Sequence, residues 1–99
     1  MNNIIPKDNK QIKKFCELNH IAKFAFFGSV VRDDFRPESD VDVLVEFEPG
    51  HVPGLAFFKM EHELSKILGR KVDLNTPGFL SPLIRSKVMN EAVVQYDAA

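Results

Sequence analysis

The sequence predicts an α/β protein with a small mixed sheet of about four strands packed against helices. Short apolar runs bounded by turn residues alternate along the chain with segments whose apolar residues recur every three or four positions. The 99 residues are 44% hydrophobic and 27% charged, the composition of an ordinary globular domain. This length supports one hydrophobic core, so we expect a single domain over residues 1–99.

Apolar spacing and turn residues define the expected elements of the N-terminal half. Residues 8–18 have the spacing of an amphipathic helix, and residues 21–27 form a Phe-rich run that ends at a glycine, typical of a buried strand. We expect a short helix over residues 29–35 and a second strand over residues 40–47. The segment between the two strands, 28–39, leaves open whether they pair parallel or antiparallel.

The C-terminal half contains the clearest helix of the chain, over residues 55–68. Its apolar residues follow i, i+3, i+4 spacing, and Gly69 suits the end of such a helix. Residues 70–75 alternate as a short strand does. Ser81-Pro82 supplies a cap and a first-turn proline for a helix to about residue 91, and we expect a last short strand over residues 92–96.

The composition argues against several classes of protein. Thirteen basic and fourteen acidic residues give a net charge of −1, which argues against direct nucleic-acid binding by bulk electrostatics. The single cysteine, Cys16, leaves no disulfide within the chain and no thiolate zinc site, and we expect it to be inert packing. No apolar run approaches the roughly 20 residues that span a membrane, so we expect a cytoplasmic protein. His20, His51 and His62 are widely spaced, which favours core or surface roles over metal ligation.

Two aspartates at alternate positions begin the second expected strand. Asp40 and Asp42 would project from one face, where like charges repel and are costly to bury, and a hard cation such as Mg²⁺ relieves both effects. Asp73 lies between apolar residues of the third expected strand and joins the pair if the two strands are neighbours. Three carboxylates could then hold two Mg²⁺ ions for phosphoryl chemistry. The alternatives are structural: Asp40 as a loop cap, and Asp42 and Asp73 as solvent-exposed residues.

A Gly28-Ser29 turn follows the first expected strand. Glycine lets the backbone approach a ligand closely, the N–H groups that begin a helix bind anions, and Ser29 adds a hydroxyl donor. Arg32, three residues on, could reach a triphosphate. Taken alone, Gly-Ser is more often a turn with a serine cap, and Arg32 a surface partner of Asp33 and Asp34. With the downstream aspartates, the turn indicates metal-assisted chemistry on a nucleoside triphosphate.

This combination of a Gly-Ser turn, an Asp-x-Asp pair and a later strand-borne aspartate resembles the nucleotidyltransferase fold of the DNA polymerase beta superfamily. The resemblance is closest to the minimal nucleotidyltransferases, the antitoxin halves of MNT–HEPN toxin–antitoxin pairs. It extends over nearly the whole chain, and three further stretches look like the family pattern: residues 39–47, 68–74 and 91–94. One departure is Asp33, where the family often has glycine.

The resemblance implies roles for individual residues and a reaction. Three residues would bind the nucleotide: Gly28, Ser29 and Arg32. Three acids would be catalytic and bind Mg²⁺, with two ions expected: Asp40, Asp42 and Asp73. The implied reaction is transfer of AMP from ATP to a hydroxyl group, expected to be a tyrosine, of a partner HEPN ribonuclease toxin, which neutralises the toxin.

The same resemblance bears on which protein supplies the surface that binds the AMP acceptor and on which other functions are open. Larger relatives, such as antibiotic adenylyltransferases, carry an additional helical domain for the acceptor, and this chain has no room for one. We therefore expect the partner protein to supply the acceptor surface. Two other functions stay open: a non-catalytic antitoxin that acts by direct binding to the toxin, and an enzyme that modifies a small molecule.

Overall fold

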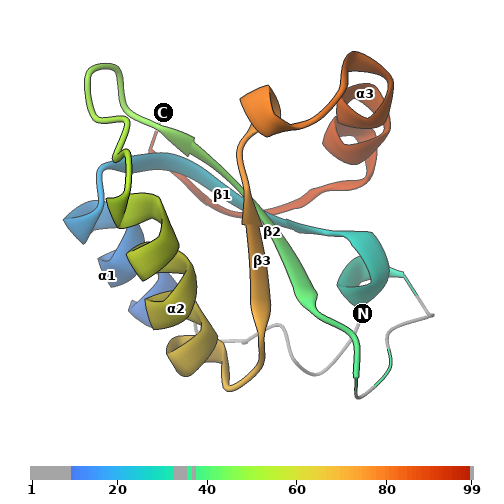
Figure 1. Cartoon of the computed structure of the whole chain (residues 1–99), viewed down its shortest axis with the longest axis horizontal. Coiled ribbons are helices and arrows are strands. Elements are labelled where there is room, and N and C mark those ends of the chain that lie inside the picture. Colours follow the sequence, from blue (N-terminus) through green and yellow to red (C-terminus); the bar gives the residue numbers. More distant parts are fainter. Residues whose placement is uncertain (1–9, 33–35, 37, 99) are drawn as a thin grey trace.

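The computed structural model describes residues 10–32, 36 and 38–98 of the chain (Figure 1). Within these ranges the chain forms three α-helices: α1 (Lys10–Leu18), α2 (Ala56–Leu68) and α3 (Pro82–Glu91). The same ranges form four strands: β1 (Ile21–Phe27), β2 (Val41–Phe47), β3 (Val72–Asn75) and β4 (Val93–Asp97). They also contain two short 3₁₀ helices: η1 (Gly28–Val31) and η2 (Pro77–Phe79). The expected elements follow in the expected order, with one exception described below.

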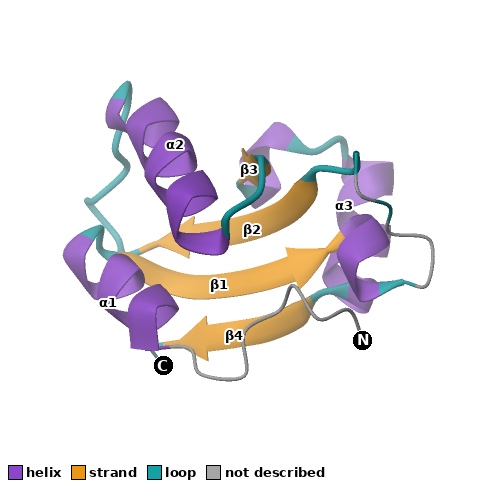
Figure 2. Ribbon diagram, turned by 90° about the horizontal axis from the view of Figure 1, so that it is seen from below, coloured by secondary structure: helices purple, strands orange, loops and turns teal. Residues whose placement is uncertain are grey.

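The four strands form one mixed sheet in the order β3-β2-β1-β4 (Figures 1 and 2). β1 pairs antiparallel with both β2 and β4, whereas β2 and β3 run parallel. The pairing of the first two strands, which the sequence left open, is therefore antiparallel. α2 lies between β2 and β3 in the chain and provides the crossover that a parallel pair requires.

Helices pack on both faces of the sheet. α1 and α2 bury the main core against one face, and Figure 2 shows α3 apart from that pair. Val88 of α3 forms a second, smaller core with Phe27 and Leu44 on the other face. Cys16 is fully buried in the main core, which confirms its packing role. Burial, with a further contribution from the charge of Glu17, raises the pKa of the Cys16 thiol to about 12.

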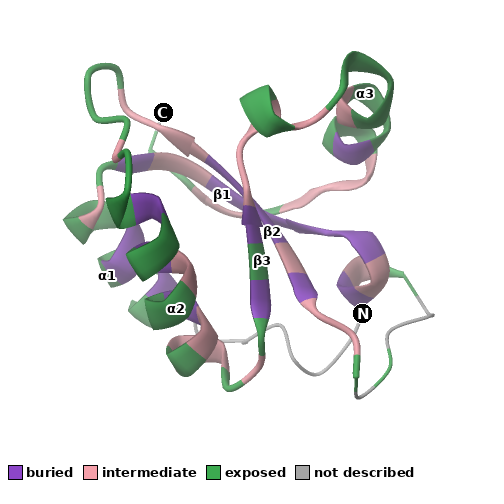
Figure 3. Ribbon diagram, viewed as in Figure 1, coloured by how far each residue is buried: buried purple, intermediate pink, exposed green. Residues whose placement is uncertain are grey.

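Successive side chains of β2 point alternately toward the main core and toward the candidate site on the other face of the sheet. Val41, Val43 and Val45 are completely buried in the main core. Figure 3 shows buried segments along β2 beside half-buried ones. Because successive strand side chains point to opposite faces, Asp42 and Leu44 lie on the other side of the sheet. The valines of this strand therefore face away from Asp42.

The short helix expected over residues 29–35 is a 3₁₀ helix and ends earlier than expected. The chain forms one 3₁₀ turn over Gly28–Val31, and Arg32 already has extended backbone angles, φ −106° and ψ 174°. Val30 and Val31 are β-branched, which disfavours helix, and Val30 is completely buried in the main core. Residues 33–35, which include Asp33, lie outside the described residues.

The two long C-terminal helices have the termini that the sequence predicts. Oγ of Ser81 accepts a hydrogen bond from the N–H of Ile84 at 3.5 Å, and Pro82 occupies the first turn of α3. Gly69 ends α2 in the left-handed region, with φ 70°. No helix within the described ranges is long and apolar enough to cross a membrane.

Candidate functional site

Asp42 and Asp73 lie next to each other on adjacent strands. The parallel register of β2 and β3 pairs these two residues, and Phe27 at the end of β1 is opposite Asp42 in the antiparallel pair. The third strand therefore brings Asp73 to Asp42, as expected if the strands are neighbours. Asp42 is half-buried and Asp73 is exposed, so the pair is open to solvent on the face away from α1 and α2.

The surroundings of Asp42 favour its protonated form. Its pKa is raised to about 6, mainly because the carboxyl group is partly buried and then because the negative charges of Asp73 and Asp40 lie close to it. A hydrogen bond between the carboxyl groups of Asp42 and Asp73 acts in the same direction, whereas the positive charge of Arg32 lowers the pKa. A single proton between the two carboxyl groups relieves their repulsion, and a divalent cation would do the same.

Asp40 influences Asp42 electrostatically but stands apart from the other two acids. Its Oδ2 atom lies 4.0 Å from Nζ of Lys71, and both side chains are exposed. Among the described residues, the carboxylate oxygens of all three acids do not come within 4.8 Å of one another. An exposed ion pair of this length contributes at most about 1 kcal/mol, so Asp40 can turn toward Asp42 with little loss of free energy.

Gly28 places the backbone at the end of β1 against Asp42. Its φ of 74° is a left-handed conformation that disfavours other residues, and a Cβ atom here would overlap Oδ2 of Asp42. The close approach that the structure shows at this glycine is to the carboxyl group of Asp42, and its approach to a ligand stays a prediction. Only glycine fits between the end of β1 and Asp42.

Ser29 and Arg32 lie in and just after the same turn. Ser29 is half-buried, and its carbonyl accepts a hydrogen bond from the N–H of Arg32 at 3.1 Å. The helix N-terminus expected here as an anion site does not exist in the described residues, because a single 3₁₀ turn has no substantial dipole. The groups at this turn that could contact a phosphate are its N–H groups, the Ser29 hydroxyl and the Arg32 guanidinium.

Glu91, the last residue of α3, contacts two of the expected nucleotide-binding residues. Its Oε1 accepts a hydrogen bond from the N–H of Gly28 at 3.2 Å, and its Oε2 lies 3.5 Å from a guanidinium nitrogen of Arg32. Sequence reasoning assigned no role to this residue, because 63 positions separate it from Gly28. The one available signal was its place in the last stretch that resembles the family.

Two side chains of α2 hold β3, and with it Asp73, in place. β3 is an edge strand, so one side of its backbone has no strand partner. The N–H of Val72 donates to Oγ of Ser65 at 3.0 Å, and the N–H of Leu74 donates to Oε2 of Glu61 at 2.9 Å. These side chains make the hydrogen bonds that a further strand would make, on both sides of Asp73.

The donor set at the three aspartates fits Mg²⁺. It offers carboxylate oxygens, which are the ligands that Mg²⁺ prefers, beside a turn that a triphosphate can approach. Burial, followed by the negative charges of Asp73 and Asp40, raises the pKa of Asp42 to about 6, and a bound cation would favour the charged form instead. The residues that could hold the ion are Asp42 and Asp73, with Asp40 after rotation of its side chain.

Two features at the opposite end of β2 were not expected from the sequence. An apolar cavity of about 340 Å³ is lined by the end of β2, the loop before α2 and η2, and no expected site residue contributes to it. His20 and His51 come together with Glu48, with their ligand atoms within 4.8 Å of one another. Both histidines are exposed, in line with the surface role expected for them, and their spacing along the chain gave no sign of this group because the fold brings distant positions together.

In this chain a Gly-Ser turn meets carboxylates of two adjoining strands on a mixed sheet. This arrangement defines the nucleotidyltransferase class of proteins. The sequence matches the family described as nucleotidyltransferase domain over residues 8–94. The chain belongs to this family.

Named relatives agree with this assignment. Protein adenylyltransferase MntA of Thermococcus cleftensis is 37% identical over 82 residues, which cover 82% of this chain and 81% of MntA. MJ0435 of Methanocaldococcus jannaschii, also named as a protein adenylyltransferase, is 36% identical over 73 residues, which cover 74% of this chain and 77% of MJ0435. The chain is an enzyme of the nucleotidyltransferase class and is similar to protein adenylyltransferases.

Solved structures share the fold. A minimal nucleotidyltransferase is 32% identical and has a TM-score of 0.73, covering 86% of each chain. A toxin–antitoxin complex with AMP-PNP has a TM-score of 0.75 at 20% identity, covering 91% of this chain and 73% of that chain. A tri-AMPylated Shewanella oneidensis HEPN toxin in complex with MNT antitoxin has a TM-score of 0.67 at 19% identity, covering 90% and 69%. The expected minimal nucleotidyltransferase fold is confirmed.

Proposed function

We propose that this protein is a Mg²⁺-dependent antitoxin that transfers AMP from ATP to a hydroxyl group, expected to be a tyrosine, of a HEPN ribonuclease toxin. The Asp42–Asp73 carboxyl pair beside the Gly28 turn carries the proposal. The relatives support it, since one is named a protein adenylyltransferase, one similar fold occurs with AMP-PNP and another with a tri-AMPylated HEPN toxin. Because the reaction consumes ATP, we place it in the cytoplasm.

The turn after β1 would bind the triphosphate. Gly28 lets the turn lie directly against the carboxyl group of Asp42, so phosphates bound at the turn would be next to the proposed metal ligands. Ser29 would donate a hydrogen bond through its hydroxyl group, and Arg32 would supply positive charge to the phosphate oxygens. Glu91 holds Gly28 and Arg32 together, so we assign it the role of a positioning residue for this turn.

The acidic residues would bind the divalent cation. Bound Mg²⁺ would neutralise charge on the triphosphate and make the phosphorus more electrophilic. Asp42 and Asp73 present their carboxyl groups from two hydrogen-bonded strands, so the sheet fixes the spacing between them. Asp40 would complete the ligand set by turning away from Lys71.

The proposed reaction is a displacement at the α-phosphorus of ATP. The acceptor oxygen forms a bond to the α-phosphorus, the bond from that phosphorus to the bridging oxygen of the β-phosphate breaks, and pyrophosphate leaves. The proton of the acceptor hydroxyl must be accepted by a base. We assign this to Asp73, because its carboxylate is the exposed member of the pair and an acceptor on another protein can reach it.

Intact mass of the toxin tests the proposal. The chain is co-expressed with a HEPN toxin, as wild type, as Asp42→Asn and as the control Glu46→Gln, which changes a carboxylate on the same strand and face. We expect the toxin to gain one or more AMP units with wild type and with the control, and none with Asp42→Asn. An unmodified toxin with wild type would overturn the enzymatic proposal.

A second candidate is a non-catalytic antitoxin that neutralises the toxin by binding it. Large apolar side chains exposed near the start of α2 favour this candidate, since Leu55 is 86% exposed and Phe58 is 67% exposed. Growth of cells that express the toxin separates the two candidates. Loss of rescue with Asp42→Asn supports catalysis, whereas full rescue together with a stable complex supports direct binding.

A further inference from the structure

The backbone brings three potential metal ligands together where β1 begins and β2 ends. The N–H of Glu48 donates to the carbonyl of His20 at 2.9 Å, which joins the residue before β1 to the residue after β2. The N–H of His51 donates to the carbonyl of Glu48 at 3.0 Å and closes a turn around Pro49-Gly50. Proline followed by glycine with φ 82° suits a type II turn, so the position of His51 is set by the local sequence.

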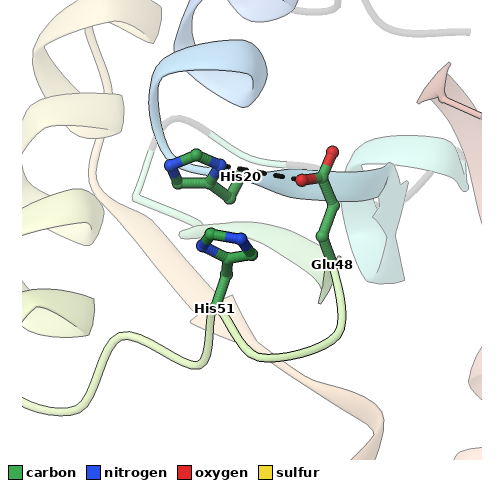
Figure 4. A group of neighbouring side chains, drawn as sticks. All are labelled: His20, Glu48 and His51. Carbon is green, nitrogen blue, oxygen red and sulfur yellow. Dashed lines mark ion pairs between the residues drawn. The ribbon is translucent and has the colours of Figure 1, made fainter.

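The three side chains converge on one place (Figure 4). Nδ1 of His20 lies 3.6 Å from Oε2 of Glu48, and the rings of His20 and His51 stack with centroids 3.9 Å apart and an interplanar angle of 17°. One ligand atom from each residue lies within 4.8 Å of the other two, and the part of the chain that the structure describes contains no other such group. All three residues are accessible to solvent, so an ion can reach them.

We propose that His20, Glu48 and His51 bind one transition-metal ion, with Zn²⁺ as the first candidate. Two imidazoles and a carboxylate are a ligand set that Zn²⁺ favours, whereas Mg²⁺ favours oxygen ligands alone. The site is therefore chemically distinct from the aspartates, and the whole of β1, roughly 25 Å of strand, separates the two. It goes beyond the proposed function and does not depend on it.

The geometry requires one small rearrangement. Ligand atoms on a tetrahedral Zn²⁺ ion lie about 3.4 Å apart, given bonds of about 2.0–2.2 Å, and the 3.6 Å between His20 and Glu48 is already close to this value. The lone pairs of stacked rings lie in nearly parallel planes, so one ring must turn for both rings to direct a nitrogen at a shared ion. His51 is exposed in a loop and can turn without disturbing the core. The bound ion would tie the start of β1 to the loop that leads into α2.

Calorimetric titration with Zn²⁺ tests the site in the full chain without a histidine tag. Millimolar Mg²⁺ is present throughout to occupy the aspartates. We expect wild type to bind one equivalent of Zn²⁺, His51→Ala to bind at least about ten-fold more weakly, and His62→Ala to match wild type. His62 is a matched control because it is an exposed histidine on α2 that is not part of the group.

Thermal melting and visible spectra make the test independent of any single variant. Zn²⁺ is expected to raise the melting temperature of wild type and His62→Ala but not of His51→Ala or Glu48→Gln. Substitution by Co²⁺ is expected to give the visible absorption of a nitrogen-ligated ion, which His51→Ala loses. Equal Zn²⁺ affinity in wild type and His51→Ala would overturn the proposal. Loss of binding in Asp42→Asn alone would also overturn it, because the ion would then sit at the aspartates.

Discussion

Asp42 weakens the metal-free fold for the same reason that it suits a cation. Its pKa is about 6 in the folded chain, against about 3.9 for an ordinary aspartate. Above pH 6 the Asp42 carboxylate is charged in both the folded and the unfolded state. Only in the folded state do burial and the charges of Asp73 and Asp40 make this charge unfavourable. This penalty declines as the pH falls from 6 to 4 and is absent below 4, where both states are protonated.

Asp42→Asn should therefore stabilise the protein in EDTA at neutral pH. The full shift corresponds to roughly 3 kcal/mol, and because Asp42 is only half-buried we expect about 1–2 kcal/mol at pH 7.5. The difference from wild type should shrink toward zero by pH 4. Urea unfolding at pH 7.5, 5.5 and 4 measures it, with Glu46→Gln as the control. A difference that does not change with pH would contradict the assigned cause.

Glu91 should affect nucleotide binding more than the chemical step, because it contacts the turn and not the aspartates. Glu91→Ala removes the acceptor of the Gly28 N–H and one ion-pair partner of Arg32, so we expect KM for ATP to rise about three- to ten-fold, with kcat within about two-fold of wild type. Glu91→Gln can still accept from Gly28 and should show a smaller rise. Asn90→Ala, on an exposed neighbour in α3, serves as the control. A lower KM in Glu91→Ala would instead mean that the carboxylate competes with phosphate.

The site residues that the sequence alone could identify are those marked by a pattern of neighbouring residues within a few positions. Asp42 alternates with buried valines, and Gly28 follows directly on a buried strand, so both stand out within a few positions. Glu91 and His51 have no such signal, since the atoms that they meet come from elements remote in the chain. The offset of Asp40 toward Lys71 likewise depends on the packing of two strands.

At the scale of elements, the sequence predicted the helices and strands because apolar residues recur with a different period in each. The error at η1 arose from a segment too short to show a period, where the burial of Val30 decides the conformation. Antiparallel pairing of β1 with β2 could not be predicted, because a connection over residues 28–39 fits either direction. The hydrogen bonds from β3 to α2 depend on tertiary packing and leave no local pattern.

Glu61 should hold β3 in place through the hydrogen bond that its carboxylate accepts from the N–H of Leu74. Glu61→Ala leaves the N–H of Leu74 without this partner, and we expect a loss of about 1–2 kcal/mol in stability and faster amide exchange at Leu74. AMP transfer should fall as well, because Asp73 is the neighbouring residue on the strand. Hydrogen exchange by NMR measures the effect, and Glu63→Ala, an exposed acid of the same helix, is the control. Equal exchange at Leu74 in both variants would refute the role.

At the scale of the whole molecule, the candidate site joins parts that the chain otherwise keeps apart. Gly28 ends β1, Asp42 and Asp73 come from two further strands, and Glu91 comes from the helix on the same side of the sheet as the second core. A ligand that contacts all of them binds only when the sheet and α3 are correctly assembled. Binding should therefore stabilise the entire fold and not only the local turn.

Mg²⁺ together with AMP-PNP should raise the melting temperature of the wild-type protein. At about 100 times the dissociation constant, linkage adds about 2.7 kcal/mol, which for a domain of this size corresponds to roughly 10 °C or more. AMP-PNP in EDTA should give a much smaller shift, because the carboxylates then repel the triphosphate. Asp42→Asn should lose most of the shift, whereas His51→Ala should retain it, since its site lies at the other end of the strands. Differential scanning fluorimetry measures all four cases. An equal shift in EDTA would mean that the nucleotide binds without the metal, and the role assigned to the three aspartates would be wrong.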